Sequence, residues 1–422
     1  MKKAKYIFSI LISLFMICYI TDAYCNSLDT GKAKFTVSAA EPPDSEKDIS
    51  NELRKNIYDS IKYENTLTLS RDVPEITASE CMILDMTTDR IIYNKNAYTK
   101  VPMASTTKIM TFIVAIENCE DINETVTVSA NAAATPGSTM HLAEGETISL
   151  HDLLYGLLLN SGNDAAVAIS EHIGGSIESF ADMMNEKALK LGALNTKFKT
   201  PHGLDEEGHY TTAYDLSIIS KNAYTNSLFK KIIGTKSITL NGHFLKNTNP
   251  FLGSYENVTG GKTGFTSEAG KCIVFFVEKD AFCAVCVILG CPTSESRVSD
   301  GAKMIDYLVD NFNTYKIFNR GLTIDTFPVT KGLSKTVKGI IDDNVYITLA
   351  KWEEPVIDIT YKRSSKSLSA PISKSSPLGN IEIYCCEDYI LNIGVISENR
   401  IIKKSYFNHL GDIIETLPDL ML

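Results

Sequence analysis

Three short groups of residues in this 422-residue chain have types and spacings suited to chemistry at a serine. The first is Ser105-Thr106-Thr107-Lys108, at the start of an apolar run, 105–118, predicted to be a helix. Residues i and i+3 share one helix face, so the Ser105 hydroxyl and the Lys108 amine can meet. A serine needs an adjacent base, and lysine can act as one when burial or a nearby cation lowers its pKa. Taken alone, the same spacing fits a serine N-cap followed by a solvated lysine.

The second group is Ser161-Gly162-Asn163, between predicted helices 150–159 and 165–173. By itself it also fits an ordinary turn between helices, where these residue types are common. The third group is Lys262-Thr263-Gly264, which follows two glycines and precedes a predicted strand. By itself it is equally compatible with a glycine turn. A phosphate-binding loop is excluded, because the position where that loop needs its first glycine is Glu256.

Hydrophobic periodicity predicts the elements that must position these groups. Strand-like alternation flanks a block of apolar helical patterns, which predicts an α+β fold with an antiparallel sheet. The predicted strands are 80–85, 91–94, 271–278 and 281–289. The further predicted helices are 180–191, ending at Gly192, then 214–224 and 298–313, with a short helix at 49–63. Later runs at 337–350, 356–362 and 381–396 predict a small all-β domain, with 368–379 as a loop.

Composition and the N-terminal residues indicate an exported globular protein. Hydrophobic residues make up 44% and charged residues 22% of the chain. The net charge of −10 without a basic cluster argues against nucleic-acid binding. Lys2, Lys3 and Lys5 precede an apolar run, 6–20, as in a signal peptide. An uncleaved anchor is the alternative, but the run is short for a membrane span.

The ten cysteines do not predict a metal site. Cys283, Cys286 and Cys291 lie in or just after an apolar strand, where alternation places the first two on opposite faces. No histidine or second CxxC completes a ligand set. We therefore predict buried, unreactive thiols, and neither a metal nor an organic cofactor.

Together the three groups resemble a known set, because SxxK, S-D-N and K-T-G in this order mark penicillin-binding proteins and class A β-lactamases. Gly162 replaces the Asp of S-D-N here, which suits the carboxypeptidases and not the β-lactamases. Segments 104–111 (ASTTKIMT), 160–165 (NSGNDA), 200–215 (TPHGLDEEGHYTTAYD) and 261–270 (GKTGFTSEAG) resemble the low-molecular-mass, serine-type D-alanyl-D-alanine carboxypeptidases. The chain departs from that pattern at Thr259-Gly260-Gly261, where an Asp-Gly-aliphatic lead is expected.

The resemblance implies the domain plan. It gives a penicillin-binding, β-lactamase-like transpeptidase domain over 73–315 and an all-β domain over 316–400. Residues 1–25 are then the signal peptide and 26–72 a polar N-terminal extension. Residues 401–422 hold an amphipathic helix whose apolar positions run from Tyr406 to Leu417. We expect this helix to bind a membrane surface, with a helix docked on the β domain as the alternative.

The resemblance also implies the roles at the site. Ser105 attacks the penultimate D-Ala carbonyl of a peptidoglycan stem peptide, Lys108 takes its proton, and Ser161 relays a proton to the leaving amine. Asn163 holds the substrate backbone, while Lys262, Thr263 and Gly264 form the motif that engages the terminal carboxylate. The backbone N–H groups of Ser105 and Phe265 form the oxyanion hole. β-Lactams are expected to acylate Ser105.

Other enzyme classes fit the sequence less well. A class A β-lactamase needs a general-base glutamate on a loop after the second group, whereas Glu171, Glu178 and Glu186 lie on or beside predicted helices. A non-catalytic penicillin-binding scaffold does not require an intact Ser105, Lys108 and Lys262. A Ser-His-Asp hydrolase would need a G-x-S-x-G elbow, which the chain lacks.

Overall fold

The computed structural model describes residues 49, 53, 73–352, 357–385 and 388–405. The predicted signal peptide, most of the 26–72 extension with its helix at 49–63, and the predicted helix from Tyr406 to Leu417 lie outside these residues. Among the described residues, none of the helices combines the length and apolar character that a membrane span requires.

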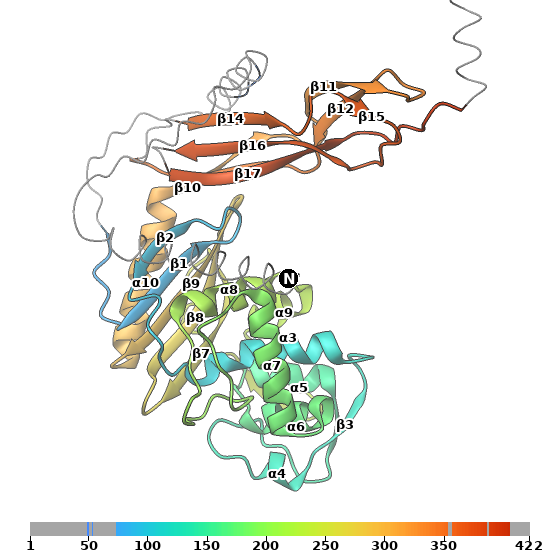
Figure 1. Cartoon of the computed structure of the whole chain (residues 1–422). Coiled ribbons are helices and arrows are strands. Elements are labelled where there is room, and N and C mark those ends of the chain that lie inside the picture. Colours follow the sequence, from blue (N-terminus) through green and yellow to red (C-terminus); the bar gives the residue numbers. More distant parts are fainter. Residues whose placement is uncertain (1–48, 50–52, 54–72, 353–356, 386–387, 406–422) are drawn as a thin grey trace, which may run out of the picture. The chain divides into compact units, whose positions relative to one another are not determined.

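The first domain is built on one antiparallel sheet (Figure 1). Its strand order is β2 (Ile91–Lys95), β1 (Glu80–Asp85), β9 (Phe282–Cys291), β8 (Gly270–Lys279) and β7 (Val258–Thr266). The predicted strands and the α+β class are confirmed. Because β1 precedes the helical block and β7 to β9 follow it, the sheet joins segments about two hundred residues apart, as in the pairing of Glu80 with Leu289.

The helical block lies between β2 and β7 in the chain. Its helices are α3 (Lys108–Asn118), α4 (Ala130–Ala133), α5 (Leu150–Leu158), α6 (Asn163–Gly174), α7 (Ile177–Leu191), α8 (Ala213–Tyr224) and α9 (Ser227–Ile233). Two small hairpins lie within it, β3 (Thr125–Thr127) with β4 (Thr147–Ser149), and β5 (Ser237–Leu240) with β6 (His243–Lys246). A last helix, α10 (Ser294–Asn311), follows β9.

The central sheet separates two hydrophobic cores. On β8, Val274 and Phe276 pack with the helical block, whereas Ile273 and Phe275 pack with α10 residues. Strand side chains alternate between faces, so a run that is apolar at every position is buried on both sides. The sheet therefore forms the middle layer of the domain, between the helical block and α10 (Figure 1).

Local signals explain where two helices begin and end. Helix α7 ends at Gly192, as predicted, with Gly192 in the left-handed conformation at φ 83°. Helix α10 begins four residues before the predicted position 298 and ends at Asn311. The earlier start has a clear cause, since Thr293 and Ser296 form a capping box.

The C-terminal domain is all β, as predicted. Its strands are β10 (Phe312–Phe318), β11 (Thr323–Thr330), β12 (Thr336–Ile341), β13 (Val345–Ala350), β14 (Ile357–Arg363), β15 (Leu368–Ser369), β16 (Pro377–Cys385) and β17 (Asp388–Ser397). β10 pairs with β13, and the other six form one sheet in the order β14-β16-β17-β12-β11-β15. The expected loop at 368–379 is partly wrong, because β15 pairs with β11 and β16 begins at Pro377.

The described cysteines of the central sheet are free thiols, all of them buried except Cys283, which is half-buried. Cys283 contacts the core on the helical side and Cys286 lies in the core on the α10 side, so the predicted opposite faces are confirmed. Burial raises the pKa of both thiols. They therefore stay protonated and unreactive at neutral pH.

Candidate active site

Ser105 lies in a single 3₁₀ turn, Ala104–Thr107, and not in the first turn of an α-helix as predicted. Helix α3 begins only at Lys108. In a 3₁₀ turn, side chains three residues apart eclipse each other. This brings the Lys108 Nζ to 2.8 Å from the Ser105 Oγ. The spacing of the first group therefore produces the contact that the sequence predicted, through a tighter turn.

Lys108 is fully buried and has no acidic hydrogen-bond partner. Besides Ser105, its amine donates to Asn163 Oδ1 at 2.7 Å and to the His202 carbonyl at 2.8 Å. Burial, and then the positive charge of Lys262, hold the pKa of Lys108 well below its usual value. Both causes disfavour the ammonium form, so Lys108 is poised to accept a proton.

The 200–215 segment, which the sequence matched by resemblance without a role, supports the nucleophile turn. The His202 carbonyl accepts bonds from Lys108 and, at 3.4 Å, from the Ser105 hydroxyl. Gly203 has φ +84°, and a Cβ there would lie 2.0 Å from the Ala104 carbonyl oxygen. Only glycine allows this approach. The segment therefore fixes the second acceptor that orients the Lys108 amine.

Two histidines in this segment are held neutral. Burial lowers the pKa of His202 to about 3 and that of His209 to about 4. His209 Nε2 lies 2.9 Å from the Thr107 hydroxyl, one residue before Lys108. Neutral rings add no charge beside Lys108 at neutral pH, so they serve as packing and hydrogen-bonding groups.

The second group joins α5 to α6 in a constrained turn. Ser161 has φ 60°, a conformation that costs energy for a residue with a side chain. Asn163 begins α6, and its Nδ2 donates to the Pro136 carbonyl at 2.7 Å. Its side-chain oxygen is thereby aimed at Lys108.

Asp164, which the sequence analysis gave no role, holds the loop beside Asn163. Its buried carboxylate accepts from the Met140 N–H at 3.0 Å and from the Leu142 N–H at 3.1 Å. The backbone N–H of Asn163 in turn donates to Ser138 at 2.7 Å. The Asn-Asp dipeptide of NSGNDA could have indicated this second anchor, because a short acid at the first turn of a helix can bind backbone N–H groups.

The sequence placed the third group before a strand, whereas the structure places it within β7. Strand β7 is at the edge of the sheet. Lys262 is buried, and its amine donates to the Ser161 hydroxyl at 2.8 Å and the Thr263 carbonyl at 2.7 Å. Burial, with a further contribution from Arg297, lowers the pKa of Lys262 to about 7. The second and third groups are thus joined directly.

Gly264 allows β7 to lie against the nucleophile turn. A Cβ at Gly264 would stand 2.9 Å from the Ser105 backbone nitrogen. The residue after Gly264 is Phe265, whose backbone N–H is expected to form the oxyanion hole together with that of Ser105. The Phe265 ring is 56% exposed and carries the Lys271 amine 3.2 Å from its centroid. The ring and the ammonium group therefore form part of the rim.

The glycine pair before Lys262 also has a packing reason. A Cβ at Gly260 would lie 2.6 Å from the Ile233 side chain, and one at Gly261 would lie 2.4 Å from the Val274 carbonyl oxygen. The departure from the family pattern at Thr259-Gly260-Gly261 thus accompanies a close approach of α9 and β8 to this strand.

Arg297 is a cation that the sequence analysis missed. It lies in α10, and its guanidinium donates weakly to the Cys272 carbonyl at 3.4 Å. Its Nε is buried without a hydrogen-bond partner. Its charge contributes to the lowered pKa of Lys262, which places it within electrostatic reach of that amine. A buried unpaired N–H beside a second cation is suited to an anionic substrate group.

The glutamates considered for a β-lactamase lie on helices, as predicted. Glu171 is in α6, and its carboxylate accepts from Ser129 at 2.5 Å and Asn131 at 2.8 Å. Glu178 and Glu186 are in α7. The bonds of Glu171 tie α6 to α4, and none of them reaches the three groups.

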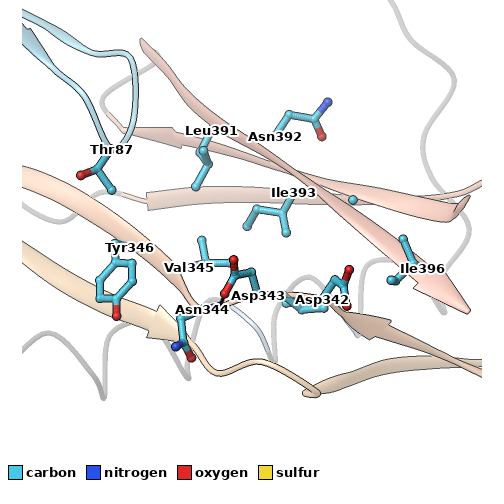
Figure 2. Close-up of a pocket in the computed structure, with 12 residues that line it drawn as sticks. Thr87, Asp342, Asp343, Asn344, Val345, Tyr346, Leu391, Asn392, Ile393 and Ile396 are labelled. Atoms are coloured by element: carbon cyan, nitrogen blue, oxygen red, sulfur yellow. Dashed lines mark hydrogen bonds between the residues drawn. The ribbon is translucent and has the colours of Figure 1, made fainter. Parts of the chain in front are cut away.

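A pocket lined almost entirely by residues of the C-terminal domain is unrelated to this chemistry. Asp342, Asp343, Leu391 and Ile393 are among the residues lining it (Figure 2). None of the residues of the three groups lines it. Across the described residues, no cluster of three or more His, Cys, Asp or Glu could hold a metal ion.

The sheet, the helical block and the contact between Ser105 and Lys108 are those of a serine-type hydrolase. Comparison with known proteins agrees. The sequence profile of D-alanyl-D-alanine carboxypeptidases matches residues 67–293, and that of the penicillin-binding protein 5 C-terminal domain matches 312–403.

Similar proteins match over most of their length. D-alanyl-D-alanine carboxypeptidase DacF of Bacillus subtilis is 34% identical over 72% of this chain and 80% of its own. DacD of Escherichia coli is 31% identical over 85% of this chain and 95% of its own. The crystal structure of penicillin binding protein 5 from Haemophilus influenzae has a TM-score of 0.70 at 29% identity, covering 79% of this chain and all (100%) of that one. The chain belongs to the D-alanyl-D-alanine carboxypeptidase family.

The two lysines predict opposite limbs in the pH profile of kcat/KM. Lys108 acts as a base only when neutral, so activity falls as pH drops through its lowered pKa. Lys262 binds a carboxylate only when protonated, so activity also falls as pH rises through about 7. In Lys262→Arg the guanidinium stays protonated, so we expect the alkaline limb to move up by at least one pH unit while the acid limb stays. Steady-state kinetics from pH 5 to 10 test this; an unmoved alkaline limb in the variant would contradict the assignment to Lys262.

Proposed function

We propose that this D-alanyl-D-alanine carboxypeptidase removes the terminal D-Ala of peptidoglycan stem peptides through an acyl-enzyme on Ser105. One observation carries the proposal. The buried Lys108 amine lies 2.8 Å from the Ser105 hydroxyl and has only neutral hydrogen-bond partners. A lysine in this state can take the serine proton at neutral pH.

The acylation step assigns each group a task. As the Ser105 Oγ bonds to the penultimate carbonyl carbon, its proton passes to Lys108. Negative charge then develops on the carbonyl oxygen, where we place the N–H groups of Ser105 and Phe265. Such a donor contributes about 3 kcal/mol to transition-state stabilisation. The proton held by Lys108 is then relayed through the Ser161 hydroxyl to the leaving D-Ala nitrogen as the bond between that nitrogen and the carbonyl carbon breaks. Water afterwards hydrolyses the ester and restores the Ser105 hydroxyl.

The substrate carboxylate is an anion, and the cationic side chains of the site are suited to bind it. We assign its binding to Lys262 and Thr263, with Arg297 as a second cation. Lys262 is fully buried and Arg297 is partly buried, and this loss of solvent strengthens their attraction for an anion. A bound carboxylate also raises the pKa of Lys262 and so keeps that amine protonated.

Covalent labelling tests the nucleophile. Ser105→Ala should abolish labelling by a fluorescent penicillin and release of D-alanine from a D-Ala-D-Ala peptide, because no acyl-enzyme can form. Ser254→Ala, outside the three groups, is the matched control and should label normally. Surviving label in Ser105→Ala would remove the central assignment. A β-lactamase would instead lose its penicillin adduct rapidly and release no D-alanine, so the lifetime of the adduct decides between the two activities.

Substrate charge tests the carboxylate site. In Arg297→Leu we expect kcat/KM for a peptide with a free terminal carboxylate to fall roughly 10- to 100-fold, because a charge-assisted hydrogen bond is lost. The rate with the C-terminal amide of the same peptide should hardly change, and Arg297→Lys should recover part of the loss. If carboxylate and amide peptides lose activity equally, Arg297 has a structural role instead.

We also propose that the chain is exported and acts at the outer face of the cytoplasmic membrane. The basic and apolar N-terminal residues support export, and the substrate is extracytoplasmic. We assign residues 406–417 to an interfacial helix, because their apolar positions recur at helical spacing.

Truncation tests that helix. The truncated chain must end at Ser405, because Ile401 pairs with Ile372 and Lys403 pairs with Gly332 in the β domain. We expect the mature chain ending at Ser405 to bind anionic liposomes at least roughly tenfold more weakly than the complete mature chain, since an apolar helix face is lost. Melting temperature and penicillin labelling serve as controls. Equal binding by both chains would favour a helix docked on the β domain.

A further inference from the structure

One end of the C-terminal domain exposes apolar side chains among lysines. Two segments meet there: the loop between β11 and β12, and the segment that follows β17. The Leu333 N–H of the first donates to the Ile402 carbonyl of the second at 2.9 Å. Leu333 is 52% exposed and Ile402 55% exposed. Their neighbours Val329 and Ile401 turn inward to a small core. The two exposed side chains therefore belong to adjacent segments and are not needed to fill that core.

Positive charge surrounds this pair. Lys331, Lys335 and Lys403 are exposed on the same two segments. Residues 329–338 and 400–405 contain six Lys or Arg and no Asp or Glu, in a chain whose net charge is −10. We call Lys331, Leu333, Lys335, Ile402 and Lys403 the lysine tip.

The opposite end of the same hairpin carries two acids, Asp342 and Asp343, of which Asp342 faces Arg320 at 4.0 Å. Strand β12 begins at Thr336, next to the lysine tip, and ends at Ile341, after which Asp342 and Asp343 line the pocket of Figure 2. Strands β11 and β12 are antiparallel, so their turn and their open end lie at opposite ends. An anionic surface therefore attracts the end with the lysines more strongly than the end with Asp342, Asp343 and Arg320, which gives the hairpin a preferred orientation.

We propose that the lysine tip is a second contact with anionic lipid headgroups, separate from residues 406–422. Exposed apolar side chains ringed by lysines combine the two terms that bind proteins to such membranes, burial of apolar area and attraction of basic residues to anionic lipid. Another exposed apolar pair, Leu189 and Leu194, differs because the charges near it are mixed, with Asp182 and Lys197 lining the same pocket and Glu186 paired with Lys190. The proposal rests on the proposed location at the outer face of the membrane.

The test uses the mature chain and vesicles of phosphatidylcholine with or without phosphatidylglycerol. A lysine near an anionic surface contributes roughly fivefold to affinity. Lys331→Gln, Lys335→Gln and Lys403→Gln together should therefore weaken binding to the anionic vesicles by at least roughly tenfold. The three Lys→Arg changes should preserve it. Leu333→Ser with Ile402→Ser should also weaken binding, while the matched pair Leu189→Ser with Leu194→Ser should not.

Two results would overturn the proposal. The first is unchanged binding in the lysine-to-glutamine variant, or equal binding to neutral and anionic vesicles. The second is that Leu333→Ser with Ile402→Ser leaves binding unchanged but lowers the melting temperature of the complete mature chain and not that of the chain ending at Ser405. That pattern would mean that residues 406–422 cover the tip.

The experiment also separates this proposal from the helix proposal. The chain ending at Ser405 keeps the lysine tip and lacks the predicted helix. Loss of binding in the lysine-to-glutamine variant of that chain supports the tip even if truncation alone has no effect. Penicillin labelling of every variant shows that the enzyme domain remains folded.

Discussion

The site depends on burying the Lys108 amine without a carboxylate hydrogen-bonded to it, so that burial and Lys262 outweigh the opposing charge of Asp164 on its pKa. A buried ammonium paired with Asp or Glu would stay charged and could not accept a proton. Here the partners are a hydroxyl, an amide oxygen and a backbone carbonyl. Lys262 adds a second positive charge, which favours the neutral form further. The surrounding segments can be understood as the means by which these neutral acceptors are held in place.

Each acceptor is fixed by backbone that few residue types can form. The His202 carbonyl precedes Gly203, whose left-handed φ of +84° allows contact with the nucleophile turn. Asn163 follows the strained Ser161, and the neighbouring Asp164 binds the adjacent loop. The central sheet supplies the remaining side through β7. Preorganisation of this kind lets the reaction proceed without rearranging polar groups as charge develops.

Sequence reasoning predicted most of the fold and the residues that meet at the site. Apolar periodicity sufficed for β1, β8, β9 and α8, because each is long or strongly patterned. It failed where a short side chain or a distant segment decides the geometry. The 3₁₀ turn at Ser105 depends on the approach of Gly203, and the strand at Lys262 on pairing with β8. Arg297 was missed because its relevance arises only when α10 packs against β8 and brings the Arg297 charge within reach of Lys262, which no local pattern indicates.

The bonds that complete the site span long stretches of chain. Lys108 reaches His202 across 94 residues, and Lys262 reaches Ser161 across 101. A partly synthesised or partly folded chain can therefore contain Ser105 while lacking the environment that makes it reactive. We expect the nucleophile to become active only when β7 has joined the sheet and Lys262 has reached Ser161. Acylation by a penicillin would then report that the distant segments of the domain have come together.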